Sequence, residues 1–156
     1  MASGLEVVQV PLEEGLGEDP EYVSWMRTGM LCTPMYWGRY IERFPDRVGR
    51  ALDALRVGDD KGKVLVHCAR GRDRTGMVCA LVGHLAGQPP GELLEAFLAG
   101  DPELRQTEHW HPREDAVVDE LIRTHLPGAR SPAEAWAMVF EELFAGEHVR
   151  AVLGAP

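Results

Sequence analysis

The sequence predicts an α/β domain with a small, mainly parallel central sheet flanked by helices. Two segments have the pattern of strands. Residues 5–12 alternate valines with polar neighbours up to Pro11, and residues 63–67 carry the β-branched Val64 and Val66. Elsewhere, apolar residues recur at helical spacing, and the second strand leads through a glycine-containing loop into a helix. We therefore expect a functional site at the carboxyl end of strand 63–67.

Length and composition predict one domain over residues 1–156, with a flexible N-terminus at 1–4. A chain of 156 residues can bury a sizeable core, and its 45% apolar and 26% charged residues are typical of soluble proteins. It contains no run of apolar residues long enough to span a membrane, and no signal-peptide pattern. Its net charge of −9 argues against nucleic-acid binding. Three cysteines without CxxC spacing favour a reducing compartment, so we expect a cytoplasmic location.

Helices broken by turns are predicted across residues 20–57. Pro20 begins the first, and Thr33 caps a second that runs from 35 to 44. Asp46 stands where an N-cap belongs and would begin the third helix. This region resembles a helical insertion and could act as a lid over a binding site.

Helices are also predicted after the central loop, over 91–98, 113–125 and 131–145. Ser131 and Glu134 form a capping box at the start of the last of these. The C-terminal helices, within residues 112–152, have apolar faces that would pack on the sheet or pair with another subunit. A homo-oligomer is therefore one of the expectations.

The eleven residues from His67 to Met77 carry the chemistry that the sequence predicts. Gly71 lets the loop backbone turn inward, and a helix is expected to begin at Thr75-Gly76. In such a loop, successive backbone N–H groups point into one concavity at the positive end of a helix dipole. That arrangement binds anions.

Side chains of this loop would make the anion site reactive. The N–H groups and nearby arginines would lower the pKa of Cys68, so that the nucleophilic thiolate exists at neutral pH. Arg74 can hold two oxygens of a phosphate with its planar fork. Thr75 can donate its hydroxyl to the thiolate and later to the departing sulfur, while His67 would lie under the loop and fix its backbone.

The pattern His-Cys-(five residues)-Arg-Thr-Gly at 67–76 resembles the signature loop of the cysteine-dependent protein tyrosine phosphatase superfamily. Residues 69–73, Ala-Arg-Gly-Arg-Asp, are most similar to the atypical bacterial tyrosine phosphatases that also act on phosphoinositides, with Arg72 in place of their lysine. The resemblance implies a tyrosine-phosphatase-like fold and hydrolysis of phosphate monoesters through a phosphocysteine, with no metal or other cofactor. Substrate binding would then fall to His67 and to the loop residues Ala69, Arg70, Gly71 and Arg72.

The same resemblance implies that Asp73, immediately before the signature arginine, is the general acid. The alternatives are other acids. Glu13, Glu14, Glu18 and Asp19 lie in the loop after the first strand, where the superfamily places a mobile acid loop. The tripeptide that ends at Asp46 imitates the Trp-Pro-Asp loop of ordinary tyrosine phosphatases.

Substrate class is left open by the sequence. Arg74 and the loop amides suffice to bind one phosphate. The extra charges of Arg70 and Arg72 therefore suggest a substrate range wider than phosphotyrosine in proteins, including phosphoinositides. A phosphate-binding module without turnover is the alternative from another class. An arsenate reductase or sulfur transferase is a weaker third hypothesis, because Cys79 lies in a helical pattern and does not look like a resolving thiol.

The position matching Leu5 is usually preceded by a longer segment in the enzymes that this chain resembles. The sheet could therefore lack its usual N-terminal strand, the chain could be truncated, or a partner could supply the missing edge.

The pair His109 and His111 also invites a metal-binding interpretation. Ligands two residues apart share a face only on a strand, and no third ligand has motif spacing. We therefore expect no metal site.

Overall fold

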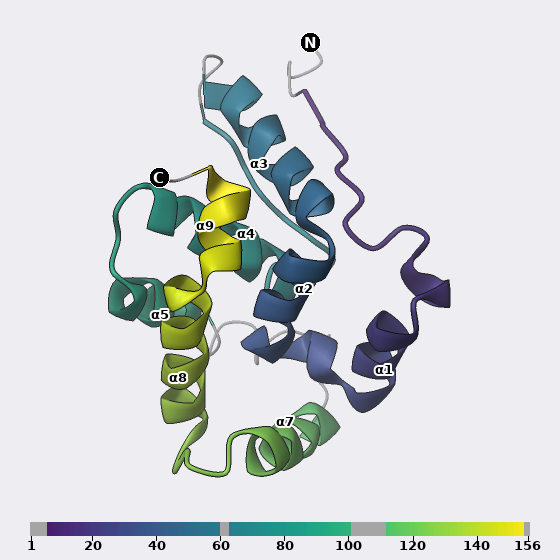
Figure 1. Cartoon of the computed structure of the whole chain (residues 1–156), viewed down its shortest axis with the longest axis vertical. Helices are drawn as coiled ribbons and strands as arrows, with labels where there is room; N and C mark the ends of the chain where they lie inside the picture. The colour runs from purple at the N-terminus through teal and green to yellow at the C-terminus, as the bar shows by residue number, and fades with distance from the viewer. Residues whose placement is uncertain (1–5, 60–62, 101–111, 155–156) are drawn as a thin grey trace.

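The computed structural model describes residues 6–59, 63–100 and 112–154, and every regular element in these ranges is helical (Figure 1). Three single turns of 3-10 helix, η1 Leu16–Glu18, η2 Met30–Cys32 and η3 Pro34–Tyr36, lie among the first helices. The α-helices are α1 Pro20–Thr28, α2 Trp37–Arg43, α3 Pro45–Asp59, α4 Asp73–Leu85, α5 Pro90–Ala99, α7 Pro112–His125, α8 Pro132–Ala145 and α9 Glu147–Leu153.

The predicted α/β fold with a small, mainly parallel central sheet is wrong, because the described residues contain no strand. Both expected strands are extended coil, and no ladder of backbone hydrogen bonds joins residues 6–11 to residues 63–67. Several of their apolar side chains face solvent, with Val7 and Leu65 each 85% exposed, while Val10 and Val66 pack partly against the core. An alternating pattern specifies a strand only where a neighbouring strand pairs with it. In this part of the chain the fold is all-helical.

The helices predicted between residues 20 and 57 are present, and side-chain caps explain where α1 and the 3-10 turn η3, which leads into α2, begin. The Asp19 carboxylate accepts hydrogen bonds from the backbone N–H groups of Glu21 and Tyr22, at 3.1 and 2.9 Å, and so caps α1. The Thr33 hydroxyl accepts from the N–H of Met35 at 3.2 Å. Asp46 is not the N-cap of α3, because that helix begins one residue earlier, at Pro45.

The main core forms around α2. Trp37 and Ile41 are fully buried, and the Trp37 ring packs against Phe97 of α5 and Phe140 of α8, with ring centroids 5.4 and 5.6 Å apart. Aromatic pairs at these distances stabilise a core beyond the area they bury. The aromatic side chains of this region are therefore part of the core.

Helix α4 contacts the Phe97 and Trp37 rings of this core at Gly76. A Cβ atom there would lie 3.1 Å from the Phe97 ring and 3.2 Å from the Trp37 ring. Because glycine has no side chain, the first turn of α4 can rest directly on the two rings. The loop that precedes α4 is thereby fixed to the core.

Helix α8 begins at a capping box, as predicted. The Ser131 hydroxyl accepts from the N–H of Glu134 at 3.2 Å, and the Glu134 carboxylate reaches back to the N–H of Arg130 at 2.8 Å. Pro132 occupies the first helical position, where a missing N–H costs nothing.

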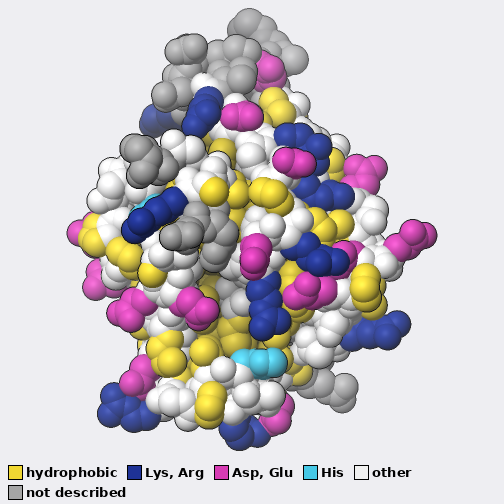
Figure 2. All heavy atoms as spheres, viewed as in Figure 1, with side chains coloured by type: hydrophobic (Ala, Val, Ile, Leu, Met, Phe, Trp, Pro, Cys, Tyr) yellow, Lys and Arg dark blue, Asp and Glu magenta, His cyan; other side chains and the backbone are white. Residues whose placement is uncertain are grey.

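The face shown in Figure 2 carries acidic and basic side chains side by side, with apolar side chains between them. Within residues 6–59, 63–100 and 112–154, the helices are all too short or too polar to form a membrane-spanning segment.

Candidate active site

The loop from His67 to Arg72 connects an extended segment to the N-terminus of α4. Gly71 has a φ of +74°, a left-handed conformation that glycine adopts without strain, and the chain turns there as predicted. The helix begins at Asp73, two residues before the expected start, and the N–H of Gly76 donates to the carbonyl of Arg72 at 2.7 Å. Arg74 and Thr75 therefore lie in the first turn of α4, where backbone N–H groups have no helical acceptor.

Cys68 lies at the point where those N–H groups converge. Partial burial alone would raise the pKa of its thiol. The Thr75 hydroxyl and the backbone N–H groups of Thr75, Arg70 and Gly71 face the sulfur, and together they lower that pKa to about 7. The thiolate is thus a main species at neutral pH. The loop and the first turn of α4 therefore suffice to lower the pKa of Cys68.

Asp73 has the opposite perturbation. Burial raises the pKa of its carboxyl group to about 6, although Arg72, Arg70 and Arg74 oppose the change. Its Oδ1 atom is buried and has no hydrogen-bond partner within the described residues. A buried carboxyl group with a pKa of about 6 can give and take a proton near neutral pH.

Arg74 forms an ion pair with Glu13, whose carboxylate oxygen Oε2 lies 2.8 Å from Nη1 of the guanidinium. Burial and then the negative charge of nearby Glu13 raise the pKa of Tyr22 to about 12. The Tyr36 ring is buried in the same neighbourhood, where Asp73 and Glu13 add to the effect of burial in raising the pKa of its phenol. The signature arginine is thus enclosed on one side by residues from before α2.

The backbone of the loop that carries Glu13 is held by the helical region. Arg47 of α3 donates to the carbonyls of Leu12 and Glu14 at 3.2 and 2.8 Å, and the Tyr40 hydroxyl donates to Leu12 as well. These contacts bring a loop near the N-terminus to the first turn of α4.

The remaining predicted loop residues differ in exposure. His67, Ala69, Arg70 and Gly71 are exposed, while Arg72 is 8% exposed. The Nδ1 atom of His67 lies 3.2 Å from the carbonyl oxygen of Cys68, but the side chain is exposed and not under the loop.

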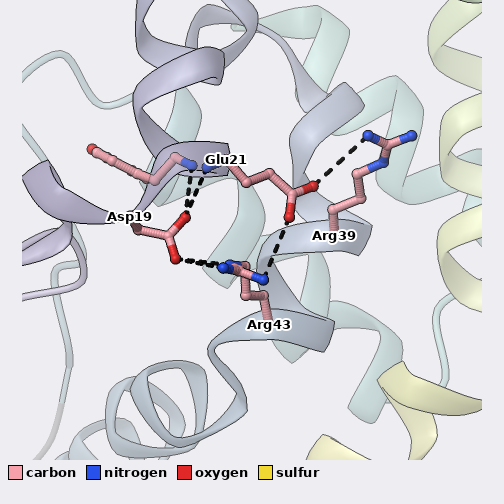
Figure 3. A network of polar contacts seen from close by, with 5 residues as sticks. Asp19, Glu21, Arg39 and Arg43 are labelled. Carbon is pink, nitrogen blue, oxygen red and sulfur yellow. Dashed lines mark hydrogen bonds and ion pairs between the residues drawn. The ribbon is translucent and has the colours of Figure 1, made fainter.

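The alternative acids have other positions. Asp19 caps α1 and binds Arg43 at 2.7 and 2.9 Å, and Figure 3 shows Glu21 beside it between Arg43 and Arg39. Hydrogen bonding to Arg43 holds the pKa of Asp19 below its usual value, which suits a structural carboxylate. Glu14 and Glu18 are exposed on the same loop. Asp46 lines a shallow hollow between α3 and α9 with Arg50 and Val152.

The ion pair between Glu13 and Arg74 and the part played by Tyr22 are not predicted by the sequence. Glu13 has the signal of an acid in a glycine-containing loop, which it shares with its neighbours. Nothing in the linear pattern selects it, because the contact depends on how α1 and α3 place the loop. Tyr22 carries only the signal of a helical apolar position.

Two further sequence observations bear on other chemistry. Cys79 is exposed on α4, and burial of part of its side chain raises the pKa of its thiol, unlike that of Cys68. His109 and His111 lie outside the described residues.

Comparison with known proteins gives one finding. The sequence model of the tyrosine phosphatase family matches residues 8–147, a span that contains the signature loop, Glu13 and the helices up to α8. No curated protein and no solved structure gives a significant match.

Proposed function

This chain belongs to the tyrosine phosphatase family, and we propose that it hydrolyses phosphate monoesters, above all phosphotyrosine in proteins, through a phosphocysteine intermediate. Membership of the family supports phosphatase activity. The observation that carries the finer proposal is the environment of Cys68. The loop N–H groups and the Thr75 hydroxyl lower the pKa of the thiol to about 7, so the nucleophile forms at neutral pH without a separate base.

In the first half of the proposed reaction, the Cys68 thiolate attacks phosphorus. A sulfur–phosphorus bond forms as the bond to the leaving oxygen breaks, and Asp73 gives that oxygen its proton. Arg74 and the loop N–H groups bind the other phosphoryl oxygens, whose charge they stabilise throughout the transfer.

In the second half, water attacks the phosphocysteine and Asp73 takes back a proton. The phosphorus–sulfur bond breaks, its electron pair returns to Cys68, and inorganic phosphate leaves. The Thr75 hydroxyl, which helps to lower the pKa of Cys68, donates a hydrogen bond to the departing thiolate. The cycle needs water and no redox partner.

The loop side chains support a substrate range that includes phosphoinositides. Arg70 is exposed beside the site and can reach a second anionic group, whereas Arg72 is buried and acts on the site through its charge. Ala69 and Gly71 would contribute backbone N–H groups, and His67 would steady the loop through the carbonyl of Cys68.

The test is phosphate release from p-nitrophenyl phosphate, a phosphotyrosine peptide, a phosphoserine peptide and phosphoinositide vesicles. Wild type and Cys68→Ser are compared without added metal, with circular dichroism to show that both are folded. We expect turnover in wild type and none in the variant. Turnover that survives the substitution would contradict the mechanism, and oxyanion binding without any wild-type turnover would instead identify a phosphate-binding module.

A further inference from the structure

The first turn of α4 packs against a cluster of three aromatic rings, which come from three other helices. Between ring centroids, Trp37 of α2 lies 5.4 Å from Phe97 of α5 and 5.6 Å from Phe140 of α8. The Phe97 and Phe140 rings lie 5.8 Å apart, so each ring of this triangle contacts the other two. Aromatic side chains packed at these distances hold one another in place.

Gly76 is the position at which α4 meets two of these rings. A Cβ atom there would lie 3.1 Å from Cε2 of Phe97 and 3.2 Å from Cη2 of Trp37. These distances are shorter than ordinary van der Waals contact, so the first turn of α4 has no room to move toward the rings. The N–H of Gly76 also donates to the carbonyl of Arg72 at 2.7 Å, which connects the packed position to the signature loop.

Thr75 connects this packing to the nucleophile. Its backbone N–H and its hydroxyl face the Cys68 sulfur and help to lower the pKa of the thiol. Thr75 immediately precedes Gly76 in the same helical turn, so a displacement of Gly76 also displaces the groups that face the sulfur. Misplacement of a catalytic group by about 1 Å can cost roughly 100-fold in rate. The contact between Gly76 and the rings therefore bears on the reactivity of Cys68.

Phe97 is the ring of the triangle that also contacts a second part of the molecule. Its side chain packs against the main core and against the second apolar cluster, which α7 and α8 form. Phe97 is half-buried, whereas Trp37 and Phe140 are fully buried. Substitution of Phe97 therefore removes a contact with α4 and leaves the two most deeply buried rings in place.

From these contacts we propose that Phe97 is a positioning residue for the Cys68 nucleophile: its ring fixes the first turn of α4 at Gly76 and thereby the Thr75 groups that face the sulfur. Phe97 acts through α4 and is not itself a catalytic residue. The inference rests on the proposed function, since it assigns a support to the nucleophile of that site. It adds α5, which lies outside the signature loop, to the elements that determine how reactive the thiol is.

The test compares Phe97→Leu with Phe144→Leu as its matched control. The Phe144 ring stacks on His84 in the last turn of α4, with ring centroids 4.5 Å apart. The control therefore removes an aromatic contact from the other end of the same helix. Both variants also remove a ring that packs against Phe140, so both should lose stability in urea denaturation.

The main readout is the pH midpoint of Cys68 alkylation by neutral iodoacetamide, with mass spectrometry of the peptide that contains Cys68. We expect Phe97→Leu to raise this midpoint by about 0.5–1 pH unit, because the Thr75 groups move away from the sulfur. Its kcat/KM for p-nitrophenyl phosphate should fall roughly 10-fold near neutral pH. Phe144→Leu should match wild type in both measurements.

A second variant tests the same contact from α4. Gly76→Ala adds a methyl group that pushes the first turn away from the two rings, so it should raise the alkylation midpoint as well. Gly49→Ala, whose Cβ atom would meet nothing within 4 Å, should keep the wild-type midpoint. This pair of variants decides the question if circular dichroism shows that Phe97→Leu does not fold.

A wild-type alkylation midpoint in folded Phe97→Leu or in Gly76→Ala would overturn the inference, because the rings would then serve only the core. An equal shift of the midpoint in Phe144→Leu would overturn it too, since general loosening of the core would explain the effect. Alkylation reports on Cys68 without any substrate. Failure of the proposed function is therefore a different outcome, in which wild type shows no turnover or Cys68→Ser retains it.

Discussion

Asp73 is a carboxyl group whose surroundings work against its own ionisation. Burial raises its pKa to about 6 despite three neighbouring arginines, and hydrogen bonds bring the pKa of Cys68 down to about 7. The proposed active form has a protonated Asp73 and an ionised Cys68. Because the first is lost as pH rises past 6 and the second as pH falls past 7, kcat/KM should follow a bell-shaped curve with its maximum between the two values.

Replacing Asp73 with asparagine gives a residue-scale prediction. Asp73→Asn cannot donate the proton, so kcat on a phosphotyrosine peptide should fall roughly 100- to 10,000-fold, and the limb of the curve at higher pH should disappear. The loss should be smaller on p-nitrophenyl phosphate, whose leaving group needs less help. The measurement is the pH dependence of steady-state rates on both substrates. An unchanged rate on the peptide would assign the role of general acid to another residue. The next candidate would be Glu14, which is exposed and follows Glu13 in the sequence.

At this same scale, the sequence predicts local chemistry well and distant contacts poorly. The surroundings of Cys68 come from residues at most seven positions away, so a contiguous pattern can specify them. The partner of Arg74 is Glu13, which lies near Arg74 only because α1 and α3 place its loop there. No spacing rule connects those two residues.

The first turn of α4 is the element that carries the site, and Gly76 sets how close it lies to the core. We expect Gly76→Ala to lower the free energy of unfolding by about 1–3 kcal/mol, because the new methyl group meets the Phe97 and Trp37 rings at 3.1–3.2 Å. Gly49→Ala is the matched control, since its Cβ would meet nothing within 4 Å inside α3. The control should raise the free energy of unfolding by about 0.5–1 kcal/mol. Urea denaturation of both variants checks the opposite signs, and a loss of stability in both would remove the packing argument.

Helices and strands differ in how much of their structure the sequence contains. Helix starts could be predicted where caps are local, as at Ser131, whereas Thr33 caps the 3-10 turn η3 ahead of α2. The strands could not be, because a strand exists only when a second segment pairs with it. The valines of residues 6–11 and 63–67 have the right alternation and, in the described chain, no ladder to join.

The two shifted groups of the site also act on the stability of the whole molecule. Asp73 binds its proton more tightly in the folded state than its ordinary pKa of 3.8 would give, so folding is progressively penalised as pH rises from about 4 to 6. Cys68 has the opposite sign: its pKa in the folded state lies below the ordinary 9, so ionisation favours the fold as pH rises from about 7 to 9.

Removing the carboxyl group should therefore stabilise the protein. We expect Asp73→Asn to unfold with a free energy higher than wild type by on the order of 2–3 kcal/mol above pH 6, with the difference vanishing below about pH 4. Chemical denaturation from pH 4 to 8 measures it, with Asp53→Asn as the control for loss of one exposed negative charge. A difference that does not change with pH would mean that the burial of Asp73 is not its cause. In that case Asp73→Asn would lose activity without changing how the free energy of unfolding depends on pH.

The loop from Pro11 to Asp19 is tied at both ends, by Arg47 to its first carbonyls and by Arg43 to its last carboxylate. A glutamate-specific protease would find three cleavage sites in this short stretch, at Glu13, Glu14 and Glu18. Proteolysis requires the segment to break its hydrogen bonds with Arg47 and Arg43 and to enter the protease as an extended chain. The cleavage rate therefore reports how often these hydrogen bonds break. The acids and glycines of this loop are typical of a protease-sensitive segment, but Arg43 and Arg47 hold it in place. Its lifetime in a cell extract would therefore depend on two side chains that are not themselves cleavage sites.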